Sequence, residues 1–161
     1  MVKQEVGVTF NTDRTNDVWH LKQLLQATRD GEISAFTSTL AIAECTSVDG
    51  SVTKKVKDIF TRLLMSGQYV VLVQPTPFIM QDGRDLKWVH GISLRGADSV
   101  HVASALDRKC DELITTDDQV KKLKAKQKLL AMGLRVICGR ETQCRQITLG
   151  LDDGKHKKPG T

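Results

Sequence analysis

The chain has 161 residues, of which 40% are hydrophobic and 27% are charged, and its formal net charge is +5. This length and balance are typical of one globular domain that buries a real core. No apolar run reaches the roughly 18 residues that a membrane span needs, and residues 1–17 contain no apolar signal-peptide stretch. The cysteines form no CxxC pair, so we expect a protein of the reducing cytoplasm with no disulfide framework and no membrane partner. The positive charge favours polyanionic or acidic partners over basic ones.

In chain order, the first predicted element is a helix over residues 16–31, where apolar residues recur at helical spacing and Gly31 marks the end. A short buried strand over 32–38 follows. It ends at Ser38, which we predict to be the N-cap of the next helix.

Further along, the strand predicted over 69–74 is apolar throughout, as expected of a strand that is covered on both faces. Thr76 and Pro77 then form a strong helix start, because Thr caps a helix and Pro fits its first position. The predicted helices that follow residue 31 cover 38–48, 51–67, 76–91, 97–109 and 118–133, and the remaining predicted strands cover 112–116 and 134–138.

Helices that alternate with short apolar strands predict an α/β fold, a three-layer α/β/α sandwich with a central, mainly parallel sheet. No repeat or linker divides the chain, so we expect one domain over residues 1–140. Residues 141–161 differ in composition. We expect an edge strand at 145–149 and a partly disordered tail around it.

Four acidic residues stand next to predicted elements, and each has an ordinary structural explanation. Glu44 lies in the apolar helical stretch "TLAIAEC", where it either faces solvent or pairs with a nearby Lys or Arg. Asp98 opens the helix "ADSVHVASAL" and interacts favourably with the helix dipole. Asp117 and Asp118 follow the strand "ELITT" and are placed to cap the next helix.

Taken together, the acids predict a different role. Ligands of open parallel sheets lie beyond the carboxyl ends of the strands, and both Asp117 and the helix that carries Glu44 follow such ends. Clustered carboxylates are hard oxygen ligands that suit Mg²⁺ or Mn²⁺. A metal pair of this kind activates a water and stabilises the leaving oxygen of a phosphodiester, and a basic protein favours a nucleic-acid substrate. The pattern does not by itself place Asp98 at the same edge.

The segments "TSTLAIAE", "ADSVHVASAL" and "ELITTDDQV" resemble the PIN domain family of metal-dependent ribonucleases, over roughly residues 18–138. The size is similar to that of the VapC-type toxins within this family. The resemblance implies that Glu44, Asp98 and Asp117 hold Mg²⁺ or Mn²⁺ and are the catalytic acids, with Thr115 as a supporting hydroxyl. It also implies that Asp98 lies at the same sheet edge as Glu44 and Asp117, which the pattern alone does not establish. As partners it implies RNA, a second copy of the chain in a homodimer, and an antitoxin protein.

One part of the family pattern is not matched. The family begins with an apolar strand that ends in Asp, whereas "VGVTFNTD" offers Asn11 and Asp13 in a different order and context. We expect a first strand that is missing or altered. The alternatives are that Asp13 serves as the ligand, or that the site is degenerate.

Several other residues are candidates for supporting roles. Ser38 and Asp118 stand beside the predicted site, and His101 shares a helix face with Asp98, where it either contacts a phosphate or is an ordinary interior residue. Basic residues of the following helix are expected to steer the RNA backbone; they are Lys121, Lys122 and Lys124. A second hypothesis, of another class, is a non-catalytic module that binds RNA or a protein on the same scaffold.

Overall fold

The structure is a computed structural model that describes residues 4–8, 18–45 and 52–143. Its strands form a single sheet with the order β3-β2-β1-β4-β5. Each neighbouring pair of strands is parallel, as predicted. The strands are β1 (Gln4–Val8), β2 (Ile33–Ser38), β3 (Val71–Val73), β4 (Glu112–Ile114) and β5 (Arg135–Ile137).

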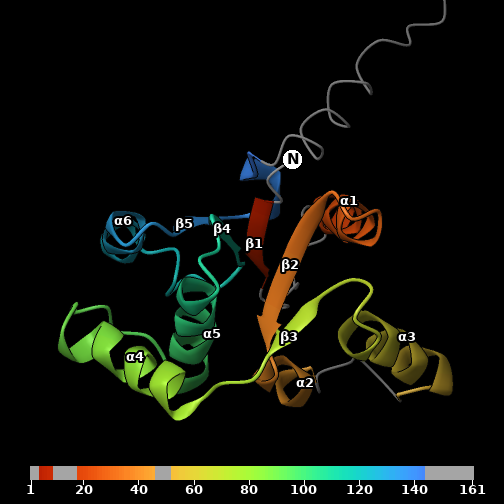
Figure 1. The fold of residues 1–161 in the computed structure, drawn as a ribbon, viewed down its shortest axis with the longest axis horizontal. Coiled ribbons are helices and arrows are strands. Elements are labelled where there is room, and N and C mark those ends of the chain that lie inside the picture. Colours follow the sequence, from red (N-terminus) through yellow and green to blue (C-terminus); the bar gives the residue numbers. More distant parts are fainter. Residues whose placement is uncertain (1–3, 9–17, 46–51, 144–161) are drawn as a thin grey trace, which may run out of the picture.

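Helices pack on the sheet from two sides (Figure 1). Leu24, Leu64 and Ile114 belong to a core cluster with α1 and α3, while Leu113 and Leu129 belong to a cluster with α4, α5 and α6. Successive strand residues point to opposite faces, which is why Leu113 and Ile114 enter different clusters. The helices are α1 (Val18–Arg29), α2 (Leu40–Glu44), α3 (Lys54–Met65), α4 (Pro77–Trp88), α5 (Gly96–Asp107) and α6 (Leu123–Ala131), followed by a 3₁₀ turn η2 (Gly139–Glu141).

Two helix ends follow the local sequence signals. The Thr76 hydroxyl accepts a hydrogen bond from the Ile79 N–H at 3.3 Å, and Pro77 opens α4 as predicted. Gly31 follows α1 with a φ of +76°, a left-handed conformation that costs glycine little. The N-cap of α2 is Thr39, one residue after the predicted Ser38. The Ser38 hydroxyl still accepts a hydrogen bond from the Leu40 N–H at 3.1 Å.

Two elements differ from the sequence prediction. β3 was expected to be covered on both faces, but it is an edge strand, and Val71 is 46% exposed. An apolar run does not encode strand order, so this prediction was wrong. The last helix was predicted from residue 118, but α6 begins at Leu123. The Asp117 carboxylate accepts hydrogen bonds from the N–H groups of Gln119 and Val120, and these bonds hold the intervening residues in turns.

β1 lies at the centre of the sheet, between β2 and β4. Residues 4–8 fill the position of the first strand, so the strand that we expected to be missing or altered is present. Asp13 and the edge strand predicted at 145–149 lie outside the described residues.

None of the helices in the part of the chain that the structure describes is long and apolar enough to cross a membrane.

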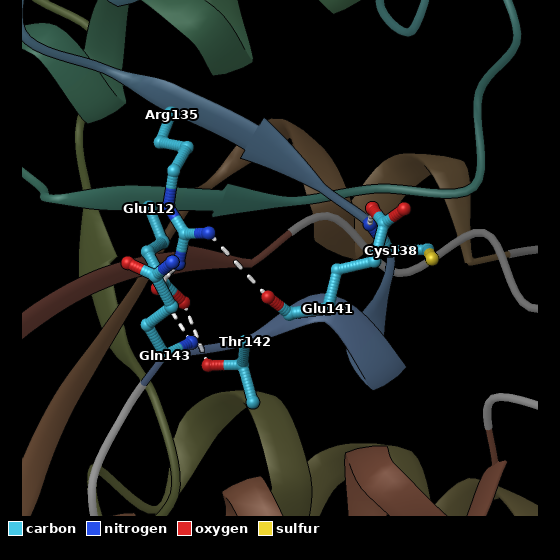
Figure 2. A network of polar contacts seen from close by, with 6 residues as sticks. All are labelled: Glu112, Arg135, Cys138, Glu141, Thr142 and Gln143. Atoms are coloured by element: carbon cyan, nitrogen blue, oxygen red, sulfur yellow. Dashed lines mark hydrogen bonds and ion pairs between the residues drawn. The ribbon is translucent and has the colours of Figure 1, made fainter. Parts of the chain in front are cut away.

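A buried carboxylate ties the chain after β5 to the amino end of β4 (Figure 2). Glu112 is only 2% exposed. Its carboxylate pairs with the Arg135 guanidinium, and it accepts hydrogen bonds from the Thr142 hydroxyl at 2.7 Å and the Gln143 N–H at 2.9 Å. The chain thus turns back after η2 toward the amino end of β4, and η2 itself contacts α1. This network lies at the opposite end of β4 from Asp117, so we assign it to stability.

A close approach joins α4 to α5. A Cβ added to Gly83 would lie 3.3 Å from the Ser99 carbonyl oxygen and 3.4 Å from the Ser99 hydroxyl. Glycine at this position lets the two helices pack closely beside the first turn of α5, where Asp98 lies.

Candidate functional site

The acidic residues that the sequence singled out come from three elements at one edge of the sheet. β2 ends at Ser38 and leads directly into α2, whose last residue is Glu44. β4 ends at Ile114 and is followed by Thr115 and Asp117.

The third element is α5, which reaches β4 through the short link 108–111. A helix that feeds a strand through a short link runs back along the sheet, and therefore begins near the carboxyl ends of the strands. This places the first turn of α5, with Asp98, at the same edge.

The charges of these acids act on one another. Burial raises the pKa of Asp98 above its ordinary value, and the neighbouring carboxylates of Asp117 and Glu44 raise it further. His101 and Arg95 act in the opposite direction, because positive charge favours the ionised acid. A carboxyl group that is crowded by like charges is a common feature of functional sites.

Glu44 has one strong partner. Its Oε2 lies 2.5 Å from Nε2 of His101, one turn along α5 from Asp98. The His101 side chain is 6% exposed, whereas that of Glu44 is 45% exposed. Glu44 therefore presents part of its carboxylate to solvent while a buried ring holds one of its oxygens. The sequence left open a basic partner for Glu44, but it did not predict that the partner would be this histidine.

Asp117 is held in place by its own turn. The Asp117 N–H donates to the Thr115 hydroxyl at 3.1 Å. Asp117 Oδ1 accepts from the N–H groups of Gln119 and Val120 at 2.7 and 3.1 Å. Asp117 was expected to cap the next helix, but its carboxylate caps a turn, and α6 begins only at Leu123, so this prediction was wrong. Thr115, the predicted supporting hydroxyl, is buried and fixes this turn.

The other predicted residues surround this turn. Asp118 forms an ion pair with Lys121 at 3.0 Å, with its own side chain 74% exposed. The Lys122 ammonium group donates to the side chain of Gln119, and Lys124 is an exposed residue of α6. Basic side chains thus follow Asp117 directly along the chain.

A small pocket lies between β2 and α5. Its polar wall residues are Thr37, Ser38, His101 and Ser104, and its apolar ones include Phe36 and Leu113. Sequence reasoning did not single out Thr37 or Ser104. Two signals were available for them. Thr37 is a polar residue inside an apolar strand, and Ser104 lies three residues after His101 on the same face of α5.

The donor chemistry suits a hard divalent cation, because the gathered groups are carboxylates. The mutual repulsion at Asp98 is what a bound cation would relieve. Even so, within residues 4–8, 18–45 and 52–143 no group of three or more His, Cys, Asp or Glu side chains is close enough to hold an ion. Among the described residues, the acids therefore do not by themselves make up a metal-binding group.

Comparison with known proteins gives a match in fold only. No protein-family model and no curated protein sequence matches the chain. A chain in the structure described as "Structure of FitAB bound to IR36 DNA fragment" is 13% identical with a TM-score of 0.52, covering 86% of this chain and 97% of that one. A chain of "Crystal Structure of FitAcB from Neisseria gonorrhoeae" is 17% identical with a TM-score of 0.47, covering 85% and 99%. Only the first match supports an argument, because of its TM-score of 0.52, and at 13% identity that argument concerns the fold alone.

Proposed function

We propose that this chain is a PIN-type endoribonuclease with a three-layer α/β/α architecture, which hydrolyses RNA phosphodiester bonds with Mg²⁺ or Mn²⁺. The observation that carries the proposal is the gathering of Glu44, Asp98 and Asp117 at one sheet edge, where the charges of the other two raise the pKa of Asp98. Acids do not crowd in this way for stability alone, because like charges disfavour one another.

Glu44, Asp98 and Asp117 are the residues that would hold the cation. When bound, the cation supplies a water of lowered pKa and neutralises charge on the phosphate. The protein itself holds the carboxylates in position. Thr115 and the turn after it fix Asp117 through its N–H and its Oδ1, and Oδ2 takes no part in the hydrogen bonds that build this turn.

Asp13 is our candidate for a further ligand. β1 ends at Val8 between the ends of β2 and β4, the strands that precede Glu44 and Asp117 in the chain. The described acids fall short of a complete metal site, and an additional carboxylate from the segment after β1 would complete it.

The partners are proposed on the same basis. The net charge of +5 and the lysines after Asp117 favour RNA. The likeness in fold to a chain of FitAB, a complex bound to a DNA fragment, together with the sequence resemblance to VapC-type toxins, supports a toxin of a toxin–antitoxin pair. We propose a homodimer that works in the cytoplasm and is held inactive by an antitoxin protein.

One observation favours a second function. Because the described acids do not complete a metal site, the chain is alternatively a non-catalytic module that binds RNA or a protein on this scaffold.

The two functions are separated by cleavage of a mixed single-stranded RNA pool in Mn²⁺. The variants to compare are Asp98→Asn and, as a control, Asp107→Asn, which removes an exposed acid at the other end of α5. We expect the unmodified chain and Asp107→Asn to cleave, and Asp98→Asn to lose at least about a hundredfold in rate, since metal ligands carry several kcal/mol of transition-state stabilisation. Equal binding of RNA by all three chains without cleavage supports the binding module and contradicts the nuclease.

A further inference from the structure

The pocket between β2 and α5 has an unusual wall. Thr37 is 4% exposed, His101 7% and Ser104 2%. All of them line the pocket. Thr37 Oγ1, His101 Nδ1 and Ser104 Oγ are also buried polar atoms without a hydrogen-bond partner among the residues that the structure describes. A buried polar atom that stays unpaired is costly, so the gathering of these atoms at one small pocket indicates a shared ligand.

The size of the pocket limits what the ligand is. The cavity measures about 10 Å³, which is room for a single water molecule. Buried polar sites of this size hold waters that make about three hydrogen bonds, and the wall offers that number of unpaired polar atoms.

The hydrogen-bond roles also match one water. Nε2 of His101 faces a carboxylate oxygen of Glu44 at 2.5 Å, so Nε2 carries the proton and donates. In the neutral ring Nδ1 is then an acceptor. A water donates to Nδ1 and to one hydroxyl, and accepts from the other hydroxyl. The Thr37 and Ser104 hydroxyls serve in either role.

We propose that one buried water bridges Thr37, His101 and Ser104, and that the ring so anchored makes His101 the positioning residue that holds the Glu44 carboxylate at the site edge. The buried water and the ring are properties of the metal-free chain. The benefit for metal binding rests on the proposed nuclease function, in which Glu44 is a ligand. Partners that orient a metal ligand change metal affinity by about 10–100-fold.

The first test uses the metal-free full-length protein. A high-resolution crystal structure is expected to show one water within hydrogen-bond distance of all three atoms. Nitrogen NMR of the ring at mildly alkaline pH is expected to show a single tautomer protonated at Nε2. A dry pocket, or a ring protonated at Nδ1, overturns the proposal.

The second test uses variants of similar shape. Thr37→Val and Ser104→Ala together remove two partners of the water and are expected to remove the water, while Glu44 still holds the proton on Nε2 of His101. Thr28→Val is the matched control, because it removes a half-buried hydroxyl that donates to the Leu25 carbonyl in α1, in the other core cluster. If the double variant leaves the water in place, the bridge is wrong.

The third test separates positioning from packing. His101→Gln can still donate to Glu44, whereas His101→Leu fills similar space and cannot. In metal-free crystals we expect an ordered Glu44 carboxylate in His101→Gln and a disordered one in His101→Leu. Mn²⁺ affinity is expected to fall about tenfold in His101→Leu and to stay within about threefold in His101→Gln. Equal behaviour of Glu44 in both variants contradicts the positioning role. If neither the variants nor the parent binds Mn²⁺, the nuclease proposal fails, and the crystals still decide on His101.

Discussion

At the scale of single residues, the site edge concentrates negative charge that His101 and Arg95 offset only in part. Asp98 is raised in pKa by burial and by the Asp117 and Glu44 carboxylates, so its ionised form is disfavoured in the folded protein. The residue is retained at a cost to stability, as is common for functional groups. This cost distinguishes Asp98 from Glu112, whose charge is compensated by several partners.

We therefore predict that Asp98→Asn stabilises the metal-free protein while impairing its activity. The gain in unfolding free energy should be below about 1 kcal/mol, because the group is partly exposed. Urea unfolding at neutral pH measures it, with Asp107→Asn as the control. Mn²⁺ should raise the Tm of the parent but not that of Asp98→Asn. A lower stability of Asp98→Asn without metal would contradict the argument from charge crowding.

For Glu112 we predict that loss of the charge destabilises the protein. Glu112→Gln leaves the Arg135 guanidinium without its counter-charge, and breaking a buried pair costs about 3–5 kcal/mol. Because the Arg135 side chain is 27% exposed, we expect the loss in unfolding free energy to lie at the lower end of this range. Urea unfolding measures the loss, and hydrogen exchange at the Gln143 amide should accelerate, since that N–H donates to the same carboxylate. Asp58→Asn on the exposed side of α3 serves as a control for removing a charge.

At the scale of elements, local signals decided where helices start and stop. Thr76 and Pro77 predicted the start of α4 correctly, because capping depends on neighbours in sequence. The start of α6 was misplaced by several residues. The Asp117 carboxylate binds the N–H groups that follow it, an alternative that side chains of this type offer to a helix. The exposure of β3 was missed because strand order depends on partners that are distant in sequence.

The packing of α4 on α5 gives a prediction at this scale. Gly83→Val places a branched side chain against the Ser99 backbone, where even a Cβ would lie at 3.3 Å. We expect a loss of about 1–3 kcal/mol in unfolding free energy from overpacking, together with weaker Mn²⁺ binding as the first turn of α5 shifts.

The matched control is Gly96→Ala at the start of α5, where an added Cβ meets nothing within 4 Å. It should leave stability unchanged or raise it slightly, since Ala is the better helix former. Equal losses in Gly83→Val and Gly96→Ala would show that the close approach is not what the Val substitution disturbs.

At the scale of the whole molecule, the α/β class and the sheet edge of Glu44 and Asp117 could be predicted, because periodicity and strand ends depend on neighbours in sequence. The place of Asp98 followed only from the family resemblance. Contacts between distant segments could not be predicted. The bond between His101 and Glu44 spans 57 positions, and neither residue alone indicates the other. The pocket lined by Thr37 and Ser104 likewise forms only because β2 and α5, which are distant in sequence, pack against each other. Asp13 remains a prediction, since it lies outside the described residues.

The positive net charge leads to a prediction about RNA binding. Replacing Lys122 and Lys124 together by Ala should weaken binding of single-stranded RNA. It should also reduce the salt dependence, by a slope of about 0.7 for each lysine that no longer neutralises a phosphate. The control replaces Lys54 and Lys55, exposed residues of α3, which packs in the other core cluster. Binding titrations over a range of salt measure both. Equal salt-dependence slopes for the two double variants would mean that RNA binding depends on total charge and not on the position of the lysines.

The central place of β1 also matters while the chain is being made. β1 pairs with β2 on one side, but on the other side Val8 pairs with Ile114. A ribosome adds roughly 5–20 residues per second, so a newly made chain carries an open strand edge for several seconds before β4 emerges. Unpaired strand edges recruit other chains. Because β1 needs partners on both sides, we expect the nascent chain to expose this strand edge until β4, residues 112–114, has left the ribosome.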